Sequence, residues 1–381
     1  MPPLRLAILT FIRVILNTAH RMIYPFLAVF ARGLGVDLAT VSALVANRSV
    51  IGAATPFLFP FIEPRGRRFG MLLGAGLVAA AMGLVALWPS LITLGAALVL
   101  ALVGKTFFDP SMLAYIADHV PYERRGAATA FSEFAWSLSF ILGVPAMGFL
   151  IAHLNWSAPF GALGLLAALA CLLLAWAARD SHRPAPHADG LFGNVRAIFT
   201  SAPALAGLAI GLFASMANEV VNLLFGVWLE DSFQLQIAAL AGASAVIGLS
   251  ELGGEGLVAL FADRLGKVRA TGIGLAANCL AASLLPLIGR TELGALAGLF
   301  LFYITFEFTL VTSIPLMSEI MPSARATTLS FNLAAHSLGR AGGALLAPVL
   351  YASGLSSATG AAVVINLLGL GAVWYVSRHH K

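Results

Sequence analysis

The sequence predicts an all-α membrane protein with twelve transmembrane helices, arranged as two six-helix bundles related by a parallel repeat. Of its 381 residues, 60% are hydrophobic and only 10% are charged, whereas soluble domains carry about 25% charged residues. The mean hydropathy is +0.92. The apolar runs are long and continuous, which favours helices over the alternating strands of a membrane barrel. Finally, two short polar motifs from the first half recur in the second.

Apolar runs of about 20 residues or more are long enough to cross the hydrocarbon core, and they define the predicted spans. In the first half these are 6–31, 38–62, 69–88, 91–117, 127–152 and 156–178. In the second half they are 203–229, 236–262, 268–289, 293–318, 326–351 and 357–377. The first run is too long for the apolar part of a signal peptide and is predicted to be a retained helix.

A polar stretch at 179–200, with Pro184 and Pro186, predicts a linker between the halves. The predicted domains are therefore an N-terminal bundle at 1–178, a cytoplasmic linker at 179–200 and a C-terminal bundle at 201–381. The linker is too short to hold a soluble domain.

The repeated motifs follow the second and fourth spans of each half. The first is Glu63-Pro64-Arg65-Gly66-Arg67-Arg68, matched by Asp263-Arg264-Leu265-Gly266-Lys267. The second is Asp118-x-x-Pro121-x-x-Arg124, matched by Glu319-x-x-Pro322-x-x-Arg325. A parallel duplication of a membrane bundle is typical of transporters built from two halves.

Basic residues are distributed unevenly across the predicted membrane. Of 22 Lys and Arg, fifteen fall in the tails and loops of one side (Arg269, at the edge of the ninth span, among them), five lie within spans, and only Arg32 and Arg290 lie on the other side. This asymmetry predicts that both termini are cytoplasmic. It explains the isoelectric point near 9.6 without a nucleic-acid partner. Cys171 and Cys279 both fall within apolar spans, so neither a disulfide framework nor a metal or other cofactor is predicted.

With Arg269, at the edge of the ninth span, counted among the loop residues, eleven Asp, Glu, Lys and Arg side chains fall inside the spans, all of them outside the third, sixth, ninth and twelfth. They are Arg13, Arg21, Arg48, Lys105, Asp109, Glu133, Glu219, Glu251, Glu255, Glu307 and Arg340. Each would cost about 2.5–3.5 kcal/mol if it faced lipid at mid-depth. We therefore expect them to face a cavity or one another.

Depth along the spans suggests partners for these charges. Arg21 lies level with Glu219, and Lys105 with Glu307, which predicts two ion pairs between the halves. Arg13, Asp109 and Glu133 share one depth in the first half. For these three an ionic lock is favoured over a binding role.

Protonation of a buried acid is the simplest coupling chemistry, since burial favours the neutral carboxylic acid. The candidates for proton coupling are Glu219 and Glu307, followed by Asp109, Glu251 and Glu255. The candidates for the substrate cavity are Asn17, His20, Arg21, Arg48, Lys105, Asn218, Asn222, His336 and Arg340. Asn17 and Asn218 occupy matching repeat positions and either bind substrate or join helices. His20 and His336 either titrate or serve as packing residues.

The first repeated motif resembles the signature loop of the major facilitator superfamily, Gly-x-x-x-Asp-Arg-x-Gly-Arg-Arg. Glu63, Gly66, Arg67 and Arg68 fit it, and Asp263, Arg264, Gly266 and Lys267 fit its second copy. Phe59 and Ala259 replace the first Gly, and Pro64 replaces the first Arg.

The resemblance implies that these loops form a cytoplasmic gate that opens and closes; the alternative is charge that only sets topology. The implied gate residues are Glu63, Arg65, Arg67, Arg68, Asp118, Arg124, Asp263, Arg264, Lys267, Glu319 and Arg325. The stretch 143–148 is similar to the Gly-Pro-rich motif of proton-driven drug antiporters, although the adjacent Gly-Pro pair is missing.

The resemblance implies a secondary active transporter rather than an enzyme. It would move small organic solutes by alternating access, with proton-coupled export of the multidrug-efflux type as the leading function. Proton-coupled uptake of an organic anion or sugar is the alternative, and a membrane-embedded receptor or enzyme is a remote one. The expected partners are a small-molecule substrate, protons and the lipid bilayer. We expect a monomer in the bacterial inner membrane.

Overall fold

The computed structural model describes residues 2–58, 65–177, 195–321 and 324–379, and every regular element within these ranges is helical. Two compact units emerge from the contacts between residues. Unit 1 comprises 1–36, 57–187 and 236–248, and unit 2 comprises 37–56, 188–235 and 249–381.

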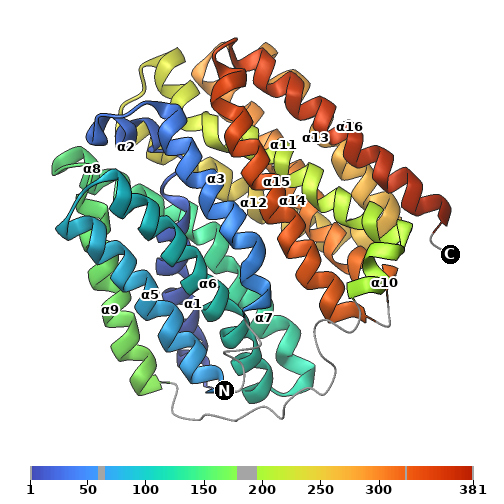
Figure 1. Cartoon of the computed structure of the whole chain (residues 1–381), viewed down its shortest axis with the longest axis horizontal. Helices are drawn as coiled ribbons and strands as arrows, with labels where there is room; N and C mark the ends of the chain where they lie inside the picture. The colour runs from blue at the N-terminus through green and yellow to red at the C-terminus, as the bar shows by residue number, and fades with distance from the viewer. Residues whose placement is uncertain (1, 59–64, 178–194, 322–323, 380–381) are drawn as a thin grey trace. The chain divides into compact units, whose positions relative to one another are not determined.

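Unit 1 is built from most of the first-half helices. They are α1 (Pro3–Arg21), α2 (Leu27–Leu34), α5 (Arg67–Leu87), α6 (Leu91–His119), α7 (Tyr122–Leu138), the π-helical turn η3 (Ser139–Gly143), α8 (Val144–His153) and α9 (Ala158–Ala177). Helix α5 packs against both α6 and α9 (Figure 1). The start of α12 (Ile237–Leu265) also belongs to this unit.

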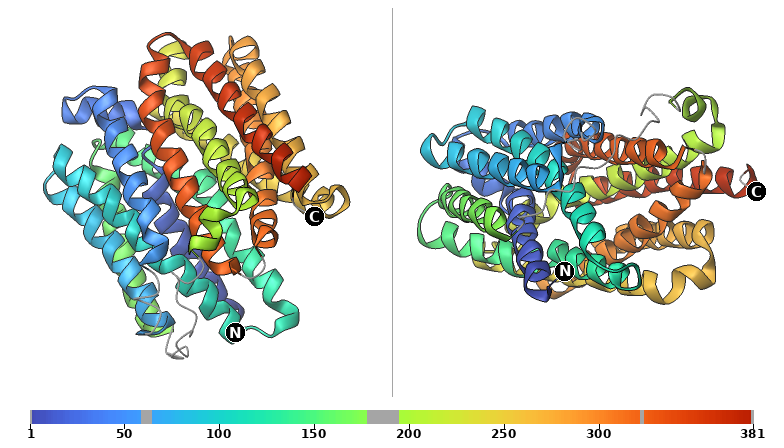
Figure 2. Two further views of the ribbon diagram at one scale, coloured as in Figure 1. Left: turned by 45° about the vertical axis from the view of Figure 1, so that its right-hand side comes forward. Right: turned by 90° about the horizontal axis from the view of Figure 1, so that it is seen from below.

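Unit 2 contains the remaining helices. They are α3 (Leu38–Ala54), α10 (Val195–Thr200), α11 (Ala202–Phe233), the rest of α12, α13 (Lys267–Ile288), α14 (Glu292–Ile320), α15 (Arg325–Tyr351) and α16 (Leu355–His379). The single turn η1 (Thr55–Phe57) continues α3. Helix α11, in yellow-green, runs beside α15, in orange-red (Figure 2).

Ten helices in the described part of the chain are long and apolar enough to cross a membrane. The two predicted spans outside this set correspond to α1 with α2 and to α15, both of which carry charged side chains, including Arg13 and Arg340. The predicted all-helical membrane fold is confirmed. Most of the predicted linker lies outside the described residues, and its last six residues form α10. The predicted domain boundaries stay a prediction.

The expectation of one continuous first helix over 6–31 is wrong. The chain leaves the α-helix after Arg21 and resumes it at Leu27. Pro25 has no N–H to donate to the carbonyl of Arg21, and the Tyr24 N–H donates to that carbonyl instead, at 3.2 Å. The intervening turn is buried throughout, so the break lies inside the protein rather than in a surface loop.

The fifth predicted span is also interrupted, by the π-helical turn η3. Here the Val144 N–H donates to the carbonyl of Ser139, five residues earlier. Pro145 follows directly and has no N–H of its own. Gly143 lies against α1, since a Cβ built on it would be 1.9 Å from Oγ1 of Thr18.

Glycines allow α5 and α6 to approach very closely. A Cβ built on Gly74 would lie 2.4 Å from the carbonyl oxygen of Gly104, and one built on Gly104 would lie 2.6 Å from that of Gly74. Gly74 and Gly104 are therefore used inside unit 1, for packing between its own helices.

The core of unit 2 gathers side chains from α10, α11, α13, α14 and α16. Ile198, Ile210, Leu275, Met317 and Val376 are among its buried members. Most residues of α11 from Ala217 to Leu229 are buried, so its polar side chains in that stretch sit within the unit.

We expect Gly74→Val to lower the free energy of unfolding by about 1–3 kcal/mol, because backbone atoms of α6 occupy the space of the new side chain. Gly76→Val, on the same helix, is the matched control, since nothing lies within 4 Å of a Cβ at that position. Thermal unfolding in detergent measures both. Equal melting temperatures for the two variants would contradict this account of the helix contact.

Candidate functional site

Four charged side chains meet in the interior of unit 1. Arg13 on α1 reaches Asp109 on α6, with Nε 3.2 Å from Oδ1, and Glu133 on α7, with a guanidinium nitrogen 2.8 Å from Oε1. Lys105 forms an ion pair with Asp109 one turn away. Arg13 also donates to the carbonyl of Ser132 at 3.0 Å. The predicted cluster of Arg13, Asp109 and Glu133 is confirmed, and with Lys105 it holds two acids and two bases.

Trp136 on α7 lies next to two more of the predicted cavity residues. The guanidinium carbon of Arg21 is 4.2 Å from the centre of the Trp136 ring and 3.5 Å from that of Phe140. Arg21 also donates to the carbonyl of Trp136 at 2.9 Å. The ammonium group of Lys105 is 5.2 Å from the Trp136 ring centre. These distances are in the range of cation–π attraction.

The two asparagines at matching repeat positions are both buried. Asn17 has no exposed surface, and neither of its amide atoms has a hydrogen-bond partner among the described residues. The amide oxygen of Asn218 lacks one as well. Asn17 therefore does not join helices through its amide in this conformation. Buried polar atoms without partners are uncommon and indicate a water, a ligand or a different conformational state.

In unit 2 a polar stripe runs along α11 through Ser215, Asn218, Glu219 and Asn222. Glu219 is fully buried and accepts a hydrogen bond from Nδ2 of Asn222 at 3.4 Å. The hydroxyl of Tyr303, on α14, donates to Oδ1 of Asn222 at 2.8 Å. The acid thus belongs to a network that extends to a second helix.

His336 on α15 lies across from the same stripe. Its Nδ1 is 2.6 Å from Oγ of Ser215, and the tautomer decides which atom donates. Its Nε2, and Oδ1 of Asn332 one turn earlier, have no partner among the described residues. Both atoms lie against Gly211, since a Cβ built there would be 2.8–2.9 Å from each. Arg340 follows one turn after His336 and is half-buried.

The two leading acid candidates each pack over a glycine of a neighbouring helix. The Cβ of Glu219 would lie 2.8 Å from a Cβ at Gly343 of α15, and that of Glu307 2.7 Å from one at Gly254 of α12. Glu307 is buried. The backbones therefore approach closely beside both carboxylates.

The other predicted residues are placed as follows. Arg48 on α3 and Glu251 on α12 are buried, and Glu255 on α12 is half-buried. His20 is half-buried, with its ring centre 6.4 Å from that of Trp136. The proposed pairs Arg21–Glu219 and Lys105–Glu307 join residues of different units and stay predictions. No group of three His, Cys, Asp or Glu side chains among the described residues is placed to hold a metal ion.

The repeated loop motifs make the same kind of ion pair in both halves. In the first half Nε of Arg67, at the start of α5, is 3.4 Å from Oδ2 of Asp118, at the end of α6. In the second half Lys267, at the start of α13, pairs with Glu319, at the end of α14. The base of the first motif thus pairs with the acid of the second motif, twice.

The remaining gate candidates lie outside these two ion pairs. Arg68 donates to the carbonyl of Ala175 at 2.8 Å, and the guanidinium of Arg65 is 5.9 Å from the Phe69 ring centre. Arg124, Asp263 and Arg264 are exposed. Glu63 and the side chain of Arg325 lie outside the described residues.

Four residues near these sites were not predicted from the sequence. Ser215 is hydrogen-bonded to His336 and Tyr303 to Asn222. Asn332 faces Gly211, and the ring of Phe140 lies against the guanidinium group of Arg21. Helical spacing could have indicated the first three. Ser215 lies three residues before Asn218, and Tyr303 and Asn332 lie four residues before Glu307 and His336. No spacing signal could have identified Phe140.

We expect Arg13→Gln to destabilise the protein by roughly 3 kcal/mol, because the buried carboxylate of Asp109 loses one of its two bases and Glu133 loses its base. The loss should not be larger, since Lys105 still compensates Asp109 and the Glu133 side chain is 40% exposed. Arg13→Gln with Glu133→Gln restores charge balance and should recover much of the stability. Denaturation in detergent measures both.

Lys267→Gln is the control for this prediction, because an exposed ion pair contributes only about 0–1 kcal/mol. A wild-type stability for Arg13→Gln, or no recovery in the double variant, would contradict the balanced cluster.

Comparison with known proteins gives a consistent result. The sequence profile of the Major Facilitator Superfamily matches residues 6–344. The MFS-type transporter YbcL of Bacillus subtilis (strain 168) is 24% identical over 340 residues, which cover 87% of this chain and 86% of YbcL.

Solved transporter structures share the fold. A bacterial homologue of the human lysosomal transporter Spinster, in an inward-facing and occupied conformation, has a TM-score of 0.79 at 17% identity and covers 99% of this chain and 98% of its own. The peptide transporter POT in complex with sulfate also has a TM-score of 0.79, at 14% identity, covering 99% and 95%. With a family profile that spans nearly the whole chain, these likenesses identify the protein as a member of the Major Facilitator Superfamily, a membrane transporter and not an enzyme.

Proposed function

We propose that this transporter is a proton-coupled exporter of small organic solutes that works by alternating access. The observation that carries the proposal is Glu219, a fully buried carboxyl group on a membrane-spanning helix. A charged group at that depth costs about 2.5–3.5 kcal/mol unless the protein compensates it. Loss of the charge by protonation removes this cost, so a change in access to water can bind or release a proton.

The surroundings of Glu219 suit a carboxyl group that changes its protonation state. The side-chain amide of Asn222 donates a hydrogen bond to Glu219, and its oxygen accepts one from the hydroxyl of Tyr303. Glu307 is the second candidate, on the same helix as Tyr303. Glu251, Glu255 and Asp109 rank behind them, and Asp109 is already paired with Arg13 and Lys105.

The export direction rests on the resemblance of 143–148 to the motif of drug antiporters. We further propose that the Arg67–Asp118 and Lys267–Glu319 pairs belong to the cytoplasmic gate. Exposed pairs of this kind contribute about 0–1 kcal/mol each, so they can form and break within a transport cycle. The distribution of Lys and Arg supports cytoplasmic termini in a bacterial inner membrane, and we propose a monomer.

We expect Glu219→Gln or Glu307→Gln to abolish solute movement driven by a pH gradient in proteoliposomes, because the amide cannot take up and release the proton. Exchange of solute without a gradient should persist, which separates coupling from folding. The solute for the assay comes from a thermal-shift screen at two pH values, since a bound ligand stabilises its carrier.

Glu292→Gln is the matched control, as it makes the same substitution at an exposed position of α14. If both buried variants retain full pH-driven movement, neither acid couples protons in this protein.

Uptake of an organic anion is the second candidate function. It is favoured by the placement of Arg21 and Lys105 around one Trp136 ring, inside a membrane bundle. Two cations beside an aromatic face suit an anionic group attached to an apolar body. Neutral sugars would make little use of this arrangement.

If the substrate is an organic anion, Arg21→Gln should weaken its binding about tenfold or more, because a charge-assisted hydrogen bond contributes about 1.5–3 kcal/mol. Arg290→Gln, at an exposed position, should leave affinity unchanged. Titration with anionic and cationic ligands of matched apolar size measures the effect. Binding of only the cationic series by the wild-type protein would exclude this candidate.

A further inference from the structure

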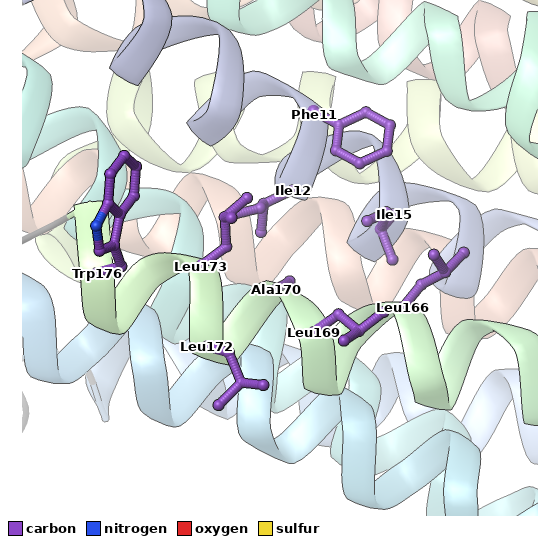
Figure 3. A pocket seen from close by; sticks show the side chains of 9 residues that line it. All are labelled: Phe11, Ile12, Ile15, Leu166, Leu169, Ala170, Leu172, Leu173 and Trp176. Carbon is purple, nitrogen blue, oxygen red and sulfur yellow. The ribbon is translucent and has the colours of Figure 1, made fainter.

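An apolar groove lies on the surface of unit 1 between α1 and α9 (Figure 3). Its volume is about 370 Å³, and every side chain that lines it is apolar. Phe11 and Ile15 contribute from α1, and Leu166 and Leu169 from α9, with Trp176 at one end. Phe11 and Trp176 are each 58% exposed. The groove is therefore open to the medium around the bundle.

The groove matches one leaflet of a bilayer in length. From Leu166 to Trp176 the helix rises about 15 Å, which is half of the hydrocarbon core of about 30 Å. A tryptophan at the end of such a stretch is typical of the membrane interface. An acyl chain thus fits along the groove, with its polar end beside Trp176.

Apolar lining alone cannot select a lipid. The surrounding lipid tails are as apolar as the groove, so filling it brings no hydrophobic gain over the bulk bilayer. Preference for one lipid must come from its headgroup and from groups of the protein at the polar end of the groove.

Two arginines lie at that end. Arg5 precedes Ile12 by seven residues, which places it on the same face of α1, about 10 Å further toward the helix start. It is half-buried, and its side chain has no hydrogen bond or ion pair with any residue that the structure describes. Arg68 donates to the carbonyl of Ala175, next to Trp176. Its Nε is buried without a partner among the described residues.

We propose that the α1–α9 groove, together with Arg5 and Arg68, binds an anionic phospholipid. One acyl chain occupies the groove, and the phosphate accepts hydrogen bonds from the guanidinium group of Arg5, with the positive charge of Arg68 beside it. Arginine forms charge-assisted hydrogen bonds with phosphate oxygens, and basic sites between membrane helices recognise anionic headgroups. This lipid site requires only that the protein is inserted in a membrane. It does not depend on the proposed substrate, the direction of transport or proton coupling.

The test uses the delipidated full-length protein in detergent with phosphatidylglycerol and phosphatidylcholine of identical acyl chains. Native mass spectrometry counts bound lipid, and thermal shift measures stabilisation. We expect phosphatidylglycerol to bind more tightly, and Arg5→Gln to weaken it about fivefold, which corresponds to about 1 kcal/mol. Leu169→Trp, which fills the groove, should weaken both lipids.

Arg378→Gln is the matched control. Arg378 lies at the end of α16, with its guanidinium 4.2 Å from the ring centre of Trp374, so it offers a similar arginine and tryptophan without the α1–α9 groove. Its substitution should leave the binding of phosphatidylglycerol at the wild-type level. Equal binding of the two lipids by the wild-type protein would overturn the headgroup assignment. Unchanged binding in Leu169→Trp would overturn the groove as the site of the acyl chain.

Discussion

A charge inside a hydrocarbon layer must be compensated by the protein itself, and much of the interior of this chain follows from that constraint. In unit 1, Arg13 holds α1, α6 and α7 together because its guanidinium group has acids on two of these helices. Arg21 lies against two aromatic faces and donates to a backbone carbonyl. In unit 2, Glu219 is served by an amide and, through it, by a tyrosine hydroxyl. Each of these sets of contacts links specific helices, so the buried polar groups also help to specify how the helices pack.

The repeat distributes interactions of different strength to different depths. At the ends of the helices, both halves pair the base of one motif with the acid of the other, in partly exposed positions. Such pairs contribute little stability. Deep in the bundles the described contacts of the two halves differ: the first contains a balanced ionic cluster, and in the second Asn222 and Tyr303 link Glu219 to a neighbouring helix. The two loop ion pairs that the repeat preserves are therefore weak, and breaking them costs little.

Sequence reasoning predicted the features that depend on composition and on depth along a helix. The helical membrane fold and the Arg13 cluster follow from apolar run length and from a fixed rise per residue. The break at Pro25 was missed because hydropathy is insensitive to a turn that is buried and apolar. The partners of Arg21 were missed for another reason. Position along each helix predicts which residues lie at the same depth in the membrane. The rotation of each helix about its own axis decides which of these residues, such as an aromatic ring, contacts the guanidinium group. That rotation depends on close contacts such as the one between Gly74 and Gly104, which no single helix reveals.

The π-helical turn at Ser139–Gly143 has a consequence for how α8 is oriented. A π turn holds one residue more than the α-helical turn it replaces, and one residue corresponds to a rotation of about 100° around the axis. The faces of α7 and α8 are therefore out of phase, although the two helices share one axis through the membrane. Trp136 can thus point toward Arg21 while Gly148 meets Ala241 of α12. A uniform helical wheel drawn through the whole segment would assign one of these two residues to the wrong neighbour.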